Sequence, residues 1–372
     1  MRIRRGVAGV VLRPPGTGQG AAQERDQGQA AMGGDSHGRV YLARARGANR
    51  RAPNSGVGRA GRRPCPFRWR VPGLAATSAP PEGSMFTGSM VAIVTPFQDD
   101  QVDFAALKRL IDWHIKEGTQ VLVPCGTTGE SATFSHDEQH RVIAEVVQHV
   151  AGRIKVVAGA GSNSTREAVS LAKAAEKFGA NGILTITPYY NKPTQDGLFE
   201  HFKAVRGATA LPLVLYNVPG RTGVNMLPET AARVAALGGI AGVKEASGSI
   251  EQMQELIERG VTVISGDDGM TFPAMALGAV GVISVVANFA PKIMRQLVDA
   301  CAKGDLIEAR RLHRIVVELA KHAFAETNPI PAKAAVAALG FIREEYRLPL
   351  VPITPARKTA LLACLRKHGL LA

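Results

Sequence analysis

The residue with the clearest chemical potential is a lysine at the end of an apolar segment. Lys244 directly follows Ile240–Val243, so a strand ending there would carry its amine into a crowded, weakly polar site. A free lysine has a pKa of about 10.4 and is protonated at neutral pH. Partial burial lowers that pKa and makes the amine a nucleophile. The placement therefore predicts a Schiff-base lysine, with a solvated lysine after a strand as the alternative.

Hydroxyl groups occur where they would serve such a lysine. Tyr216 ends the neighbouring apolar segment, and Thr127 and Tyr190 follow two others. Carbinolamine chemistry needs protons moved between oxygen, nitrogen and carbon by positioned groups, and these three hydroxyls would form a relay. Taken singly, Tyr190 and its neighbour Tyr189 fit packing roles equally well.

Two further features are suited to binding carboxylates. The loop Gly126–Gly129 has small residues whose free N–H groups would hold an anion, although a plain turn explains it equally well. Arg221 follows a Pro-Gly pair, and its guanidinium would grip a carboxylate with two parallel hydrogen bonds or form a loop salt bridge. With Lys244, these groups predict a Schiff-base enzyme that acts on a keto acid.

A repeating pattern of strands and helices must position these residues. Short runs rich in Val and Ile alternate with amphipathic stretches, as buried parallel strands alternate with helices. Helices are predicted at 103–117, 135–150 and 165–178, the second opened by a capping box at Ser135 and the third by similar chemistry at Thr165. Gly118, Gly152, Gly179 and Gly260 suit helix ends. The eight predicted strands are 90–94, 120–124, 155–158, 182–186, 213–216, 240–243, 261–265 and 279–285.

Eight such units in about 220 residues are what a (β/α)₈ (TIM) barrel requires. A doubly wound open sheet is the alternative, but it would usually have a Gly-rich phosphate turn after its first strand, and Val94–Phe97 is not one. We expect a catalytic barrel domain at 85–304. A C-terminal helical domain is expected at 305–372, with a break between its helices at Asn328–Pro331.

Residues 1–84 have a different composition. They contain 15 Arg, no Lys and four acidic residues, and so hold +11 of the chain's net charge of +14. Rich in Gly and Pro, the segment lacks the apolar surface to offset its ordering entropy and is predicted to be disordered. A secretory signal and a transit peptide both fit poorly, and a nucleic-acid-binding arm is less favoured than an upstream extension of a protein that starts at Met85.

The rest of the composition excludes several classes. The body is nearly neutral, so no nucleic-acid partner is expected, and no long apolar run indicates a membrane span. Four cysteines without a Cys-x-x-Cys pair indicate neither a disulfide framework nor a zinc site, and fit the cytoplasm.

Five motifs together carry a resemblance to a known family. From Met85 to the C-terminus the chain resembles the dihydrodipicolinate synthase family of pyruvate aldolases. This implies condensation of pyruvate with L-aspartate 4-semialdehyde to 4-hydroxy-tetrahydrodipicolinate, the first committed step of lysine and diaminopimelate biosynthesis. The motifs, in order, are GTTGES (126–131), TPYYNKP (187–193), YNVPGRTG (216–223), VKEASG (243–248) and SGDD (265–268).

The resemblance implies a role for each site residue. Lys244 forms the imine with pyruvate, and Tyr216 relays protons with Thr127 and with Tyr190 of a neighbouring subunit. The family is typically a homotetramer and needs no metal or organic cofactor. Thr127 and Thr128 would bind the pyruvate carboxylate and Arg221 that of the semialdehyde, with Gly266 and Ile283 as further substrate contacts.

The resemblance also implies a lysine effector site at the interface between the two subunits of each tight dimer, two of which form the family's tetramer. Glu167 would pair with the effector's ammonium group. One position departs from the family pattern, because Gln139 stands where lysine-sensitive members often carry His or Glu. The matching positions are Ser131, Ala132, His136, Asn163, Glu167 and Tyr189.

Two rival functions are also compatible with the sequence. A sister aldolase, such as N-acetylneuraminate lyase or a 2-keto-3-deoxy sugar acid aldolase, shares the lysine and tyrosine, but Arg221 and Tyr190 argue against it. A non-catalytic barrel with a nucleic-acid-binding leader would show salt-sensitive binding and no pyruvate adduct.

Overall fold

Eight parallel strands close into a barrel. The computed structural model describes residues 84–372, and the predicted disordered leader, except for Ser84, lies outside the described residues. Strand β1 pairs with both β4 and β10, which closes the sheet and excludes an open doubly wound arrangement. The TIM barrel prediction is confirmed. The barrel strands are β1 Gly88–Ala92, β4 Val121–Val123, β5 Lys155–Gly159, β6 Gly182–Ile186, β7 Leu213–Asn217, β8 Ile240–Glu245, β9 Val263–Ser265 and β10 Gly281–Ser284.

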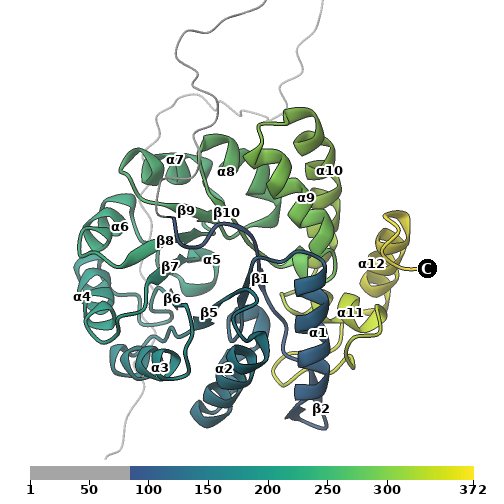
Figure 1. Cartoon of the computed structure of the whole chain (residues 1–372), viewed down its shortest axis with the longest axis horizontal. Coiled ribbons are helices and arrows are strands. Elements are labelled where there is room, and N and C mark those ends of the chain that lie inside the picture. The colour runs from purple at the N-terminus through teal and green to yellow at the C-terminus, as the bar shows by residue number, and fades with distance from the viewer. Residues whose placement is uncertain (1–83) are drawn as a thin grey trace, which may run out of the picture. The chain divides into compact units, whose positions relative to one another are not determined.

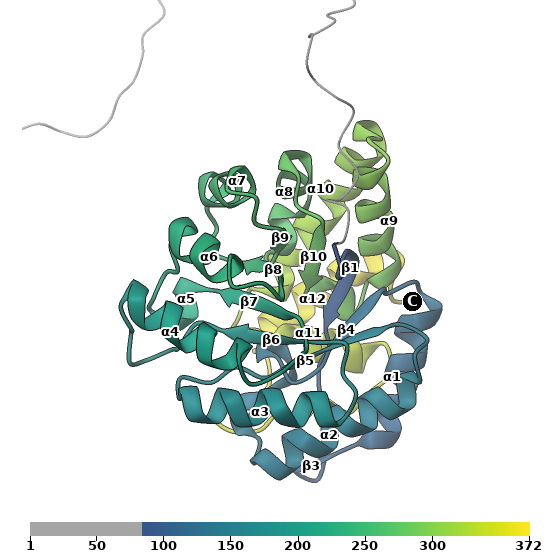
Figure 2. The same cartoon turned by 60° about the vertical axis from the view of Figure 1, so that its left-hand side comes forward.

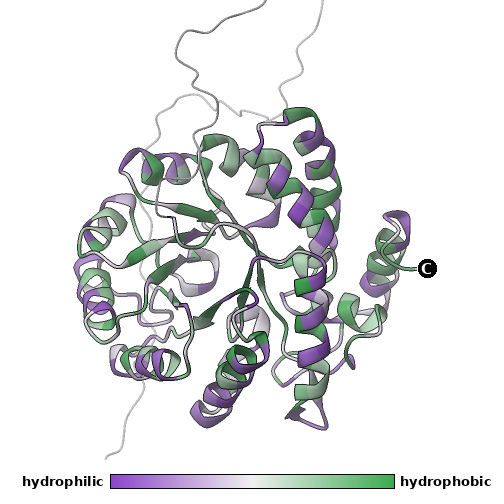
Figure 3. Cartoon of the chain, in the orientation of Figure 1, coloured by the Kyte–Doolittle hydropathy of each residue, from purple (hydrophilic) through white to green (hydrophobic). Residues whose placement is uncertain are grey.

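Helices surround these strands in a ring (Figures 1 and 2). Their inner faces are hydrophobic and their outer faces polar (Figure 3), because each helix packs one stripe on the barrel and exposes the rest to solvent. A small hairpin, β2 Phe97–Gln98 with β3 Gln101–Val102, precedes the first helix. The ring helices are α1 Phe104–Lys116, α2 His136–Val150, α3 Thr165–Lys177, α4 Gln195–Arg206, α6 Pro228–Ala235, α7 Ile250–Glu258, α8 Thr271–Leu277 and α9 Pro291–Ala302.

Local sequence signals set the ends of several helices. The Ser135 hydroxyl accepts a hydrogen bond from the N–H of Glu138 at the start of α2, as predicted. At α3 the cap is Ser164, one residue before the predicted Thr165, because it is the Ser164 hydroxyl that accepts from Glu167 N–H. Gly118 and Gly179 have positive φ just after α1 and α3, a conformation that glycine adopts without penalty.

Three helices follow the barrel. Helix α10 (Leu306–Ala323) packs on α8 and α9, and α12 (Pro355–Lys367) packs on α10 and α11 (Ile330–Ala338). Helix α11 begins at Ile330, within the predicted break at Asn328–Pro331, and its side chains are almost all buried. Among the described residues, no helix combines the length and apolar content that a membrane crossing requires.

Candidate active site

A small cavity lies at the C-terminal ends of the barrel strands, where barrel enzymes place their catalytic groups. Its volume is about 140 Å³. Lys244, the fifth residue of β8, lines it opposite the loop that follows β4. Among the predicted site residues, the cavity wall contains Thr127, Thr128, Tyr216, Arg221, Lys244 and Gly266.

Lys244 is buried, with 5% of its surface exposed. Burial lowers the pKa of Lys244 from an ordinary 10.5 to about 8; the positive charge of Arg221 adds to this shift and the negative charge of Asp268 opposes it. Its amine therefore has a substantial neutral fraction close to physiological pH, as a Schiff-base nucleophile requires.

Tyr216 lies beside Lys244 because the two residues are in register on adjacent strands. The Lys244 Nζ is 4.2 Å from the centre of the Tyr216 ring. Burial raises the pKa of Tyr216, while the positive charge of Arg221 and a hydrogen bond with Thr127 oppose this rise. Three of the predicted residues, Lys244, Tyr216 and Thr127, are thus brought together by strands β8, β7 and the β4 loop.

Arg221, the second residue predicted to bind a carboxylate, lies in the short helix α5 (Pro219–Thr222). Its Nη2 donates to the main-chain oxygen of Asn328 at 3.2 Å. The side chain of Asn328 reaches the opposite side of the cavity and donates to Thr128 Oγ1 at 3.0 Å. The sequence around Asn328 predicts only a break between helices. Because Asn328 and Thr128 are 200 residues apart in the chain, no local signal indicates that they line the same cavity.

Asp268 is a second site residue that the sequence reasoning missed. Burial raises the pKa of Asp268 to about 6, although hydrogen bonds from Ser284 and from the N–H groups of Val285 and Val286 oppose this rise. The carboxylate joins the segment after β9 to the end of β10, and its negative charge opposes the lowering of the Lys244 pKa. Asp268 belongs to the motif SGDD (265–268), but the burial that gives the residue its effect is a tertiary property.

Glu245, the next residue after Lys244, supports the same strand end from the outside. Because successive side chains of a strand point to opposite faces, Glu245 lies behind the barrel wall, fully buried. Its carboxylate accepts hydrogen bonds from Asn217 Nδ2 at 3.0 Å, Gln252 Nε2 at 2.9 Å and Ser247 N at 2.7 Å. This network fixes the end of β8 and with it the position of Lys244.

The remaining predicted substrate contacts are placed unequally. Gly266 must be a glycine, because an added Cβ would lie 2.7 Å from Ala246 Cβ and 3.1 Å from Lys244 Cγ. Ile283 is buried in β10 and is not among the residues that line the cavity. Tyr190 is 89% exposed, with a positive φ of 71°, and its side chain is not part of the cavity wall.

A second cavity of about 360 Å³ adjoins the first and shares with it Gly126, Thr127, Leu184, Tyr216 and Arg221. Glu167 accepts hydrogen bonds from Ser162 and His136, which hold the pKa of its carboxyl below the ordinary value. Five of the six predicted effector positions line this cavity, the exception being Asn163: Ser131, Ala132, His136, Glu167 and Tyr189.

Gln139, the departure from the effector pattern, also lines the second cavity. Its Nε2 donates to the Gly159 carbonyl at 2.9 Å and the side chain is buried. It therefore serves the wall of the cavity as a neutral group, where a His or Glu would introduce a titrating one.

Within the described part of the chain, one group of side chains has the composition of a metal site. Glu318, Cys364 and His368 bring three ligand atoms within 4.8 Å of one another between α10 and α12. Lys367 Nζ already lies 2.6 Å from a carboxylate oxygen of Glu318, and none of these residues lines the cavity at Lys244. The lysine chemistry does not involve this group.

A buried lysine with a lowered pKa, a tyrosine in register beside it and a closed (β/α)₈ barrel together define a class I aldolase, the Schiff-base type. The family model described as "Dihydrodipicolinate synthetase family" matches residues 85–368, and the chain belongs to this family.

Individual relatives agree with this assignment. The 4-hydroxy-tetrahydrodipicolinate synthase of Pelobacter propionicus is 53% identical over 77% of this chain and 100% of its own length. The chloride-inhibited dihydrodipicolinate synthase from Acinetobacter baumannii, a pyruvate complex, is 44% identical, with a TM-score of 0.75 over 77% of this chain and 99% of that one. The lysine-bound enzyme from Cyanidioschyzon merolae is 39% identical, with the same TM-score and the same shares covered.

Proposed function

We propose that this chain condenses pyruvate with L-aspartate 4-semialdehyde to 4-hydroxy-tetrahydrodipicolinate, in the biosynthesis of lysine and diaminopimelate. The observation that carries the proposal is Lys244, whose burial lowers its pKa to about 8, next to the ring of Tyr216 and a loop suited to a carboxylate. The relatives named as synthases favour this reaction over those of the sister aldolases.

The reaction begins at Lys244. Its neutral amine attacks the keto carbon of pyruvate, and water leaves after the carbinolamine oxygen is protonated, giving an imine. Loss of a methyl proton converts the imine into an enamine, which attacks the aldehyde carbon of the second substrate. The amino group of that substrate then attacks the imine carbon, closes the ring and releases Lys244.

Tyr216 and Thr127 supply and remove the protons of these steps. Because burial disfavours the phenolate, Tyr216 rests as the neutral acid and can protonate the carbinolamine oxygen. Thr127 hydrogen-bonds with Tyr216 and faces both cavities. It would pass the proton onward toward the second cavity and the solvent. Positioned proton transfer of this kind contributes about 10²–10⁴ in rate.

The two carboxylates would bind at separate places. Thr127 and Thr128 begin a short 3₁₀ turn, and N–H groups at the start of such a turn have no internal acceptor. They would hold the pyruvate carboxylate together with the threonine hydroxyls. Arg221, anchored on the Asn328 carbonyl, would hold the carboxylate of the semialdehyde. We retain Gly266, which lines the cavity, and Ile283, which is buried in β10, as predicted substrate contacts.

A neighbouring subunit would complete the relay. Tyr190 does not line its own cavity, and its exposure of 89% leaves its ring free to enter the site of another copy. We propose a homotetramer in which each of two paired subunits inserts Tyr190 into the site of the other. We also propose that the protein is located in the cytoplasm, where the buried thiols of Cys125, Cys301 and Cys364 would stay reduced. Mutation of Tyr190 to Phe should lower kcat without changing the mass of the assembly.

We further propose that lysine binds in the second cavity as an inhibitor. Glu167 offers an ionised carboxylate there, and the lysine-bound relative has the same fold. Glu167→Ala should abolish inhibition by lysine, whereas Glu255→Ala, an exposed acid paired with Arg259 on α7, should leave inhibition unchanged. Equal inhibition of both variants would refute the effector site.

Trapping of the imine tests the main proposal directly. Borohydride reduction in the presence of pyruvate, followed by intact mass spectrometry, should add one pyruvate-sized group to the wild type and none to Lys244→Ala. Addition of the semialdehyde should then give turnover by the wild type alone. An active wild type that forms no adduct would remove the Schiff-base mechanism.

A further inference from the structure

One hydrogen bond connects the helices after the barrel to the loop that lines the site. Asn328 Nδ2 donates to Thr128 Oγ1 at 3.0 Å. Both side chains are buried, Asn328 with 5% and Thr128 with 2% of the surface exposed, and both line the cavity that contains Lys244. The bond therefore lies within the site itself.

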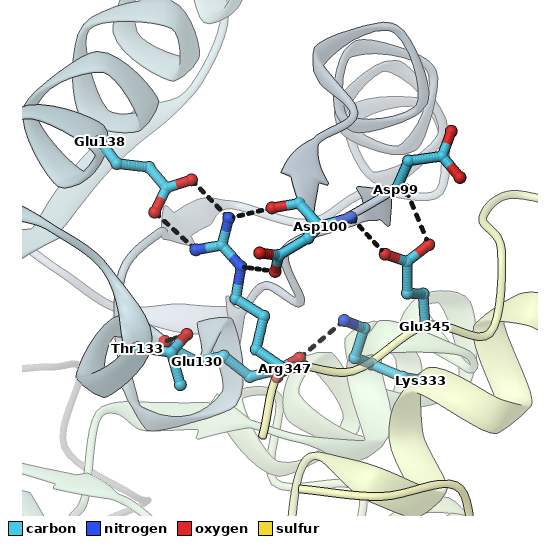
Figure 4. Close-up of polar contacts among 8 residues, drawn as sticks. All are labelled: Asp99, Asp100, Glu130, Thr133, Glu138, Lys333, Glu345 and Arg347. Atoms are coloured by element: carbon cyan, nitrogen blue, oxygen red, sulfur yellow. Dashed lines mark hydrogen bonds and ion pairs between the residues drawn. The ribbon is translucent and has the colours of Figure 1, made fainter. Parts of the chain in front are cut away.

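A buried ion pair holds the two segments in place (Figure 4). Glu130, two residues after Thr128, lies 2.6 Å from the Nζ of Lys333, five residues after Asn328, and both side chains are fully buried. The N–H of Arg347 donates to the second oxygen of Glu130 at 3.2 Å. The guanidinium of Arg347 contacts Glu138 and Asp100. Because a buried ion pair is stable only in close geometry, it fixes the relative position of Asn328 and Thr128.

We propose that Asn328 is a positioning residue that orients the Thr128 hydroxyl for the carboxylate of pyruvate; this rests on the proposed function. A hydroxyl has one proton and two lone pairs. Since Thr128 accepts from an amide N–H, which cannot accept in return, the hydroxyl proton is left to point elsewhere, into the cavity. There it would be donated to a carboxylate oxygen. The Asn328 amide thus holds the Thr128 hydroxyl in the orientation that binds the substrate.

The contacts of Asn328 favour this role over simple packing. Its Oδ1 is buried and has no hydrogen-bond partner among the described residues, an arrangement that disfavours folding. A purely structural amide would satisfy both of its ends. The Arg221 guanidinium is held by the main-chain oxygen of Asn328. A substitution of the Asn328 side chain keeps this contact, and so tests the pyruvate site apart from the semialdehyde site.

The test compares the KM values for the two substrates in variants of Asn328. In Asn328→Ala, the KM for pyruvate should rise about three- to tenfold, the effect of one neutral hydrogen bond, while the KM for the semialdehyde stays unchanged. Asn328→Asp should raise the pyruvate KM further, because the new carboxylate would accept the hydrogen bond of the Thr128 hydroxyl and would repel the carboxylate of the substrate. In a Thr128→Val background, Asn328→Ala should have no further effect on pyruvate.

Two controls make the result decisive. Val316→Ala removes fully buried side-chain volume from α10, away from the cavity. It controls for a general loss of stability in Asn328→Ala and should leave both KM values unchanged. Trapping with borohydride gives the apparent pyruvate affinity independently of turnover. If the wild type forms no adduct, the proposed function fails. If it does, and Asn328→Ala binds pyruvate equally well or has its full effect in Thr128→Val, the positioning role is refuted.

Discussion

Replacement of Lys244 by Met tests the energetic basis of the nucleophile. Met has a similar length and no charge, so it keeps the packing of the lysine stem and removes the buried ammonium. The pKa of Lys244 falls from an ordinary 10.5 to about 8, mainly because of burial. At about 1.4 kcal/mol for each pKa unit, the folded state at neutral pH carries a cost of about 3 kcal/mol that the unfolded chain does not. Lys244→Met should therefore increase the free energy of unfolding by roughly this amount.

The pH dependence gives the prediction its sign. The unfolded chain binds the Lys244 proton more tightly than the folded chain, so the stability of the wild type rises as pH increases from about 8 to about 10.5. The advantage of the variant should shrink by about 2 kcal/mol between about pH 7 and pH 9.5.

Equilibrium unfolding in urea at both pH values, at one protein concentration, measures this difference. Lys173→Met, at an exposed position on α3, is the control and should change little at either pH. A Lys244→Met protein that is no more stable than the wild type at neutral pH, or whose advantage does not depend on pH, would refute the reasoning.

Three further outcomes are expected. The rate of borohydride trapping with pyruvate should rise with pH and level off above about 8, because the neutral amine of Lys244 is the reacting form; a rate that keeps rising to pH 10 would contradict this. Tyr216→Phe should lower kcat by about 10²–10⁴ yet still give an adduct after long incubation, as measured by mass spectrometry. Arg221→Leu should raise the KM for the semialdehyde about tenfold or more in steady-state assays, with a much smaller effect on pyruvate; equal effects on both would place the arginine elsewhere.

The fold was predictable because its signals are local. Eight apolar runs separated by amphipathic stretches require buried parallel strands covered by helices, and the observed strands agree with the predicted ones to within a few residues at each end. Polar residues that follow these runs gather at one edge of the barrel. For this reason the sequence alone groups Lys244, Tyr216 and Thr127.

The tertiary structure decided what the strand pattern does not encode. The register of β7 against β8 places Tyr216 beside Lys244, and the pairing of β8 with β9 brings Asp268 close enough to influence the charge of the amine. Asn328 reaches the site only because the segment between α10 and α11 packs against the loop after β4, where its side chain contacts Thr128.

The sequence by itself therefore determined the fold class and the type of chemistry, since hydrophobic period and residue type depend only on order along the chain. The protonation state of Lys244, the coupling of Thr128 to Asn328 and the outward position of Tyr190 were decided by tertiary structure. The physical reason is that desolvation and hydrogen-bond geometry depend on which distant segments exclude water from the same point.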